Sequence, residues 1–196
     1  MVKKTTLSIC CLLILFLLSA NVSYGEVIRV RIIIEKGSVW ESEAGKRQIQ
    51  QAANEARRIW FAGVGVPLHL PQNYTTIPGS SDNELTEQDI KSYATTHKAA
   101  ARDIVVIMRN KSFSRSRAWT ESALVASDTP VIIIGRQVFD KPGTNRDLAH
   151  ELGHVLLRDE THSPGYNDLM NITHAPNNGD TIRTEQADKA KKYPLK

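Results

Sequence analysis

The residues best suited to chemistry in this sequence form the segment HELGH, residues 150–154. On a helix, residues four positions apart face the same side, so His150 and His154 can direct two imidazoles at one point. Glu151 lies about 100° further round the helix, too far to coordinate the same ion but close enough to reach a water molecule beside it. Neutral imidazoles hold zinc, and a carboxylate can take a proton from water. The spacing therefore predicts a zinc site with Glu151 as general base.

Two histidines do not complete a zinc site, and four residues further along the chain are candidates for the third ligand. His162 is preferred because imidazole is a common ligand and the residues before it give the chain room to turn back. Asp159 and Glu160 are acidic alternatives, although Asp159 would point elsewhere if the helix continued almost to it. Glu185 is a candidate on the last helix, where an acidic residue also favours the helix dipole without any metal. The sequence leaves these alternatives open.

The wider segment, residues 150–170, resembles the metzincins, a clan of zinc peptidases. The resemblance rests on HELGH and on NDLM at residues 167–170, which is similar to the methionine-containing turn under the metal in that clan. The clan pattern continues after its second histidine with a glycine and a third ligand. Those positions fall here on Leu157 and Glu160, so this sequence departs from the pattern at both. The resemblance implies a Zn²⁺ cofactor and a single zincin/metzincin-like domain.

The resemblance also implies roles for individual residues. His162 would be the third zinc ligand, as in small bacterial metzincin-like proteins whose ligand precedes an Asn-x-Leu-Met turn, and Met170 would form an apolar floor beneath the ligands. Tyr166 either stabilises an oxyanion or is an exposed loop residue. A peptide or protein substrate would pair with an edge strand at residues 118–126. The expected function is an exported zinc endopeptidase with Glu151 as base; the alternative is a catalytically inactive zincin-fold binding or recognition protein.

The pattern of expected strands and helices that position these residues predicts an α+β domain. Strands are expected at residues 27–34, 64–70, 103–109, 118–126 and 130–134, and a polar loop at 72–83. Helices are expected at residues 43–61 and 84–101, in the segment carrying HELGH, and at 184–193. Thr144 and Asp147 are expected to cap the HELGH helix. This order predicts a mixed twisted sheet with backing helices, an active-site helix and a C-terminal helix.

The first 25 residues have the features of a secretory signal peptide. Lys3 and Lys4 precede an apolar run at residues 9–18, and small residues stand at the −3 and −1 positions of a cut after Gly25. The apolar run is shorter than the roughly 20 residues of a membrane span. We therefore expect a signal peptide at 1–25, one metallopeptidase domain at 26–196, a secreted or periplasmic location and no membrane span in the mature form.

Cysteine placement and charge limit the other classes of site. Cys10 and Cys11 are the two cysteines of the chain, so the mature domain would have neither a disulfide nor a thiolate ligand. The net charge of +4 includes Lys3 and Lys4, and the remaining excess is a short lysine-rich run near the C-terminus. Such a run is usually a solvated helix face, so no nucleic-acid partner is expected. A monomer is expected.

Overall fold

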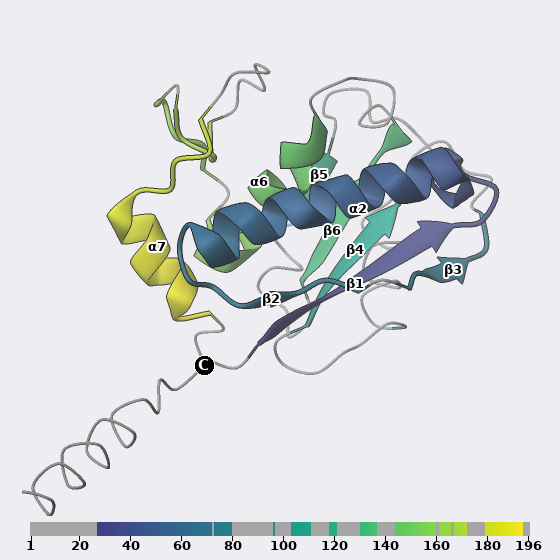
Figure 1. Ribbon diagram of the computed structural model, residues 1–196, viewed down its shortest axis with the longest axis horizontal. Coiled ribbons are helices and arrows are strands. Elements are labelled where there is room, and N and C mark those ends of the chain that lie inside the picture. Colours follow the sequence, from purple (N-terminus) through teal and green to yellow (C-terminus); the bar gives the residue numbers. More distant parts are fainter. Residues whose placement is uncertain are drawn as a thin grey trace, which may run out of the picture.

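A mixed β-sheet with a long helix along one face forms the centre of the protein in the computed structural model (Figure 1). The structure describes residues 27–71, 73–79, 96, 103–110, 118–120, 130–136, 144–159, 161–165, 167–171 and 179–193. The strand order in the sheet is β2-β1-β4-β6-β5, and β3 also pairs with β1. Within these residues, no helix combines the length and the apolar character needed to cross a membrane.

The three central strands are β1 (Ile28–Glu35), β4 (Asp103–Met108) and β6 (Val131–Ile134). They pair in parallel, β1 with β4 and β4 with β6. Every residue of β4 and β6 is buried, which explains why these strands are nearly continuous apolar runs in the sequence. The sequence predicted β4 and β6 from these runs. It predicted β1 from an alternating start followed by an apolar run, and the exposed Arg29 and Arg31 before a buried end agree with that pattern.

The edges of the sheet are short strands. β2 (Leu68–His69) and β3 (Thr75–Ile77) pair in parallel with β1, and β5 (Ala118–Thr120) pairs antiparallel with β6. The antiparallel β5 makes the sheet mixed, as predicted. Residues 121–126 of the expected edge strand, and all of the expected helix at 84–101 except residue 96, lie outside the described residues. β3 falls in the segment predicted as loop, because its exposed threonines give no apolar pattern.

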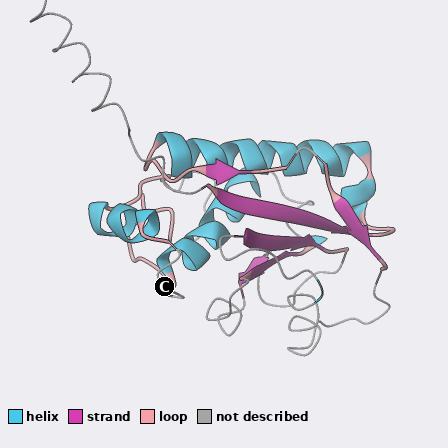
Figure 2. Ribbon diagram, turned by 90° about the horizontal axis from the view of Figure 1, so that it is seen from below, coloured by secondary structure: helices cyan, strands magenta, loops and turns pink. Residues whose placement is uncertain are grey.

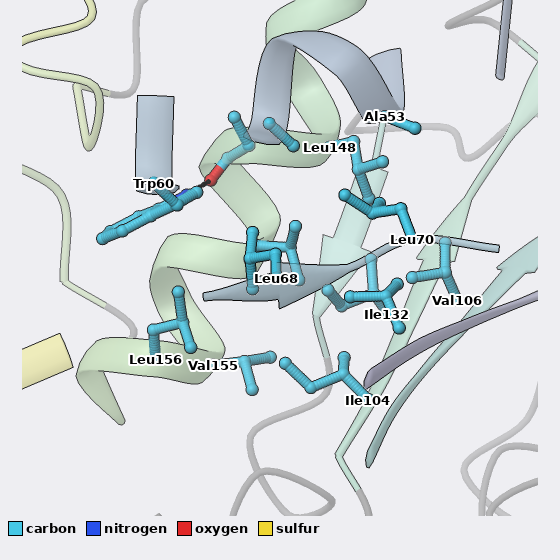
Figure 3. Close-up of a cluster of buried hydrophobic side chains, with 14 of the residues drawn as sticks. Ala53, Trp60, Leu68, Leu70, Ile104, Val106, Ile132, Leu148, Val155 and Leu156 are labelled. Carbon is cyan, nitrogen blue, oxygen red and sulfur yellow. Dashed lines mark hydrogen bonds between the residues drawn. The ribbon is translucent and has the colours of Figure 1, made fainter. Parts of the chain in front are cut away.

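Helix α2 (Glu43–Arg57) lies along one face of the sheet (Figure 2). It begins where the Ser42 side chain accepts a hydrogen bond from the Gly45 N–H, an ordinary N-cap. It continues into a π-helical turn, η2 (Arg58–Ala62), which ends near Gly63. In that turn the Trp60 indole N–H donates to the Ala149 carbonyl at 2.9 Å (Figure 3), so α2 is tied directly to the helix that carries HELGH.

Helix α6 (Asp147–Leu157) carries HELGH, and all eleven of its residues are buried. Leu148, Val155 and Leu156 face the same apolar cluster as Ile104 and Ile132 of the sheet (Figure 3). The helix therefore packs against both α2 and the sheet, and this packing fixes its backbone.

The expected cap of this helix at Thr144 is wrong. Residues Thr144–Arg146 form a 3-10 turn (η3), and the α-helix starts at Asp147 with Arg146 as an N-cap that makes no side-chain capping bond. Tighter 3-10 turns are common at helix starts and shift the first α-helical residue along the chain. The last helix, α7 (Thr184–Lys191), agrees with the predicted C-terminal helix.

Candidate metal centre

Helix α6 brings the imidazoles of His150 and His154 together. Their Nε2 atoms are 3.2 Å apart, and their rings meet edge to face with centroids 4.8 Å apart. Both side chains are buried. The four-residue spacing predicted this approach, because one turn of helix separates the two residues.

Each of these rings has its other nitrogen bound to a backbone carbonyl. His150 Nδ1 is 2.6 Å from the Leu169 oxygen, and His154 Nδ1 is 2.7 Å from the Asp159 oxygen. A carbonyl only accepts, so each Nδ1 carries the proton, and Nε2 of the neutral ring carries a lone pair. The two Nε2 atoms lie 3.2 Å apart, so two imidazole nitrogens converge on one point. Converging imidazole nitrogens are typical ligands of zinc, so this pair fits a metal ion.

The chain leaves α6 through a left-handed residue. Arg158 has φ 47° and ψ 48°. Among the described residues, it alone has a positive φ without being a glycine. The N–H of Asp159 donates to the His154 carbonyl at 3.1 Å and closes the helix end. The reversal that the metzincin pattern assigns to a glycine is made here at Arg158, one position later than Leu157.

The turn after Arg158 is held by the Asp159 carboxylate. This carboxylate accepts hydrogen bonds from the backbone N–H of Thr161 at 3.0 Å and from its hydroxyl at 2.7 Å. These bonds lower the pKa of Asp159. The carboxylate is therefore engaged with the turn, and the residue contacts the site through its carbonyl at His154 instead.

The turn returns His162 to the two helical histidines. The candidate ligand nitrogens of the three residues all lie within 4.8 Å of one another. The His162 ring is stacked on that of His150 at 5.3 Å and edge-on to that of His154 at 4.8 Å between centroids. The His162 side chain is exposed, yet the protein around it still desolvates it and lowers its pKa, which favours the neutral ring that a metal needs.

The methionine turn, which we define as residues 167–171, lies against the HELGH helix. Met170 is buried, and a Cβ atom added at Gly153 would overlap its sulfur and crowd the Trp60 ring. Gly153 therefore leaves the space that the methionine fills. The Met170 carbonyl also accepts the N–H of Ser163 at 2.8 Å, directly after His162.

The remaining candidates lie elsewhere or outside the described residues. Glu185 is exposed on α7 and forms an ion pair with Arg183 at 3.2 Å. Glu160 and Tyr166 lie outside the described residues. Glu151 is on α6 and buried, with 6% of its surface exposed. Within the part of the chain that is described, the three histidines are the group of potential ligands placed to hold a metal ion.

Comparisons with known proteins gave matches to structures but not to sequences. No family model matches the chain, and a search of curated proteins found no match. Metalloproteinase-II from Bacteroides fragilis matches with a TM-score of 0.59 and 15% identity over 88% of this chain. Archaemetzincin from Methanopyrus kandleri matches with a TM-score of 0.56 and 8% identity, covering 86% of this chain and 96% of that one.

The chain shares the fold of these two solved structures. This result confirms the predicted fold class. The chain spans about half of the metalloproteinase-II structure, 54% of its length. At these sequence identities the two matches show a shared fold, and the residues of this chain determine what chemistry its site can support.

Sequence reasoning did not find the groups that orient the candidate ligands. The carbonyls of Leu169 and Asp159 are backbone atoms, so no residue type marks them. The sequence does contain one sign of the close packing under the helix, which is Gly153. A glycine inside a helix is unfavourable and usually has a packing reason.

Proposed function

We propose that this protein is a zinc-dependent endopeptidase. The observation that carries the proposal is the arrangement of three imidazoles, His150, His154 and His162, with the Nδ1 atoms of the first two held by carbonyls. Three neutral nitrogen donors with one position left for water or substrate are typical of catalytic zinc sites. The zincin-like fold supports the proposal, since it is shared with a metalloproteinase.

His150, His154 and His162 would hold the zinc ion. When bound, zinc would supply Lewis-acid polarisation of the scissile carbonyl and of the attacking water. The carbonyls at His150 and His154 keep both rings in the tautomer whose Nε2 atom can act as the ligand. No reorientation of these two rings is then required when the ion binds.

Glu151 is the general base of the proposed mechanism. Its carboxylate accepts a proton from the attacking water at one oxygen and then delivers that proton to the leaving amine nitrogen. It follows His150 on a helix with all residues buried, so its position relative to the ligands is fixed by packing. No covalent intermediate with the protein is needed.

The substrate of this mechanism is an extended peptide, and β5 is the strand proposed to bind it. Among the described strands, β5 is the last in the sheet order, and it pairs antiparallel with β6, with Trp119 opposite Ile133. An edge strand offers backbone N–H and C=O groups to a peptide, which gives affinity without a requirement for the ends of the substrate. This mode of binding favours endopeptidase activity.

The test is hydrolysis of a mixed peptide library followed by mass spectrometry, with the zinc-loaded protein and its Glu151→Gln variant. The native protein and the variant should each bind one equivalent of zinc, and the variant should lose hydrolysis by several orders of magnitude, because the amide cannot take the proton. Hydrolysis that survives in Glu151→Gln would sink the assignment of the base. Zinc binding without hydrolysis by the native protein would instead favour the binding or recognition protein.

The proposal includes export through residues 1–25, which lie outside the described residues. It is supported by the sequence alone, by the two lysines and the apolar run that follows them. Expression in a bacterial host, followed by mass measurement of the exported protein, should give a chain that starts at Glu26. An intact N-terminus retained in the cytoplasm would contradict export while leaving the peptidase proposal in place.

A further inference from the structure

The backbone of the methionine turn contacts one candidate ligand and the residue that follows another. The Leu169 carbonyl accepts from His150 Nδ1 at 2.6 Å. The next carbonyl, of Met170, accepts the Ser163 N–H at 2.8 Å and so holds the residue after His162. The position of this short turn therefore sets the orientation of one imidazole and the place of another.

The Asp168 carboxylate fixes the shape of that turn. Its Oδ1 atom accepts the Met170 N–H at 2.8 Å, and the residue is buried, with 6% of its surface exposed. The Asp168 backbone N–H donates to the Gly165 carbonyl, and its own carbonyl accepts the Asn171 N–H, both at 3.1 Å. The peptide unit between Leu169 and Met170 supplies both the N–H bound by Asp168 and the carbonyl bound by His150. A rotation of this unit would change both bonds together.

Arg183 forms an ion pair with this buried carboxylate. Its Nε atom is 3.1 Å from the second oxygen of Asp168, as an ion pair without the alignment of a hydrogen bond. Arg183 is the residue before α7, and the same segment contacts the turn through its backbone, where Leu169 N–H donates to the Thr181 carbonyl at 2.9 Å. A buried charge without a partner is costly, so loss of Arg183 would force the carboxylate to move toward water.

We propose that Asp168 is a positioning residue of the metal centre, acting through the Leu169–Met170 peptide unit on His150, and that Arg183 holds it in place. The segment that leads into α7 is thereby coupled to metal binding. The inference rests on the proposed metal site but not on peptide hydrolysis, since its readouts are metal affinity and metal geometry.

The test compares the full-length protein with its Asp168→Ala, Asp168→Asn and Arg183→Gln variants. Zinc affinity is measured by competition with a chromophoric chelator, and ligand geometry by the visible absorption of the Co²⁺-substituted protein. Changes to groups that orient metal ligands typically lower affinity 10- to 100-fold. Asp168→Ala should weaken zinc binding about 10- to 100-fold and alter the cobalt spectrum, because the Met170 N–H loses its acceptor.

Asp168→Asn tests whether the acceptor alone is sufficient. The amide oxygen can still accept the Met170 N–H, so this variant should recover most of the affinity lost in Asp168→Ala and give a cobalt spectrum close to that of the native protein. Arg183→Gln should weaken binding and alter the spectrum in the same direction as Asp168→Ala. Because asparagine also restores the volume lost in Asp168→Ala, Arg183→Gln separates positioning from packing, since it leaves the Asp168 side chain in place.

Arg58→Gln is the matched control. Arg58 forms an ion pair with Asp180 on the same segment but is not paired with Asp168. Its loss should leave zinc affinity and the cobalt spectrum unchanged, although the segment loses a charged contact of the same kind.

The outcomes separate the inference from the proposed function. If the native protein binds no zinc, the metal site itself is wrong and the inference falls with it. If the native protein binds zinc and Asp168→Ala matches its affinity and spectrum, only the inference is overturned. If Asp168→Ala does not fold, Arg183→Gln decides, because native affinity and a native spectrum in that variant would refute the coupling.

Discussion

At the scale of single residues, the packing under the candidate site requires a glycine at position 153. Gly153 leaves room for the Met170 sulfur, and the Trp60 ring closes the other side of that space. A methyl group there would force buried neighbours to move, because a packed interior has few voids to absorb it. The left-handed backbone at the end of α6, a conformation that glycine adopts most easily, is adopted here by Arg158.

Gly153→Ala should therefore destabilise the metal-free protein by about 1–3 kcal/mol, the usual cost of overpacking a core. Chemical denaturation of the metal-free protein measures this directly. The same change made in a Met170→Ala background should cost less, since the overlapping sulfur is gone. Equal costs in the two backgrounds would show that Met170 is not the obstacle.

His162→Ala should abolish high-affinity zinc binding, because the proposed site loses one of three ligands. The loss should exceed the roughly 100-fold upper range for groups that only orient ligands. Glu185→Ala is the matched control, since that residue is paired with Arg183 on the surface of α7, and it should keep native affinity. Metal analysis and chelator competition distinguish the two. Unchanged affinity in His162→Ala would return the choice to the acidic candidates.

The sequence pointed to the three histidines that the structure brings together, but not to the backbone groups that hold them. His150 and His154 follow from helical spacing alone, whereas His162 required a guess about how the chain turns after the helix. That turn depends on Arg158 adopting positive φ, which is uncommon for a residue with a Cβ atom and has no marker in the sequence.

At the scale of elements, the apolar runs of β4 and β6 and the alternating start of β1 made the central strands predictable, whereas β3 has no such pattern. β3 is bonded to β1 through its backbone, and its exposed threonines carry no strand pattern. The α6 start was misplaced because a 3-10 turn and an α-helical turn share the same capping residues in sequence. Packing, not local preference, fixes these boundaries.

The exit from α6 gives a prediction with an internal comparison. Arg158 has positive φ, and its guanidinium lies 5.9 Å from the Tyr193 ring centroid. Arg158→Ala and Arg158→Gly both lose that contact, but only glycine removes the steric cost of the left-handed backbone, about 1–2 kcal/mol. Because glycine also loses more entropy on folding, Arg158→Gly should be more stable than Arg158→Ala by about 1 kcal/mol or less. Denaturant unfolding of the pair decides, and an alanine variant as stable as the glycine variant would contradict it.

The ion pair between Arg58 of η2 and Asp180, in the segment before α7, predicts a dependence of stability on pH. Hydrogen bonds from Arg58 lower the pKa of Glu55 and of Asp180 from their ordinary values of 4.5 and 3.8. Carboxylates with lowered pKa in the folded state stabilise the protein above those values, and the stabilisation is lost as pH falls through the folded-state pKa. Arg58→Gln should thus cost up to about 1 kcal/mol at pH 7, given the exposure of the pair, and almost nothing at about pH 2. A cost that persists in acid would mean that Arg58 stabilises by packing.

At the scale of the whole molecule, the core and the proposed metal site meet at α6 and at the methionine turn, whose Leu169 and Met170 belong to the apolar cluster. That cluster contains no ligand side chain, and the third histidine comes from the loop beyond the helix. The fold should therefore form without metal, in contrast to small zinc domains that unfold when the ion is removed.

Removal of zinc should lower Tm without unfolding the protein at 25 °C. An ion that binds only the folded state stabilises it by about 2.7 kcal/mol when free zinc is 100 times Kd, and the shift grows with concentration. Far-UV circular dichroism of the chelated protein should keep its native shape, and added zinc should restore Tm. His162→Ala should show the chelated protein's Tm at every zinc concentration, because the core is intact and the site is not. Loss of secondary structure on chelation would mean that the loop carrying His162 and the methionine turn contribute to the core more than the buried side chains indicate.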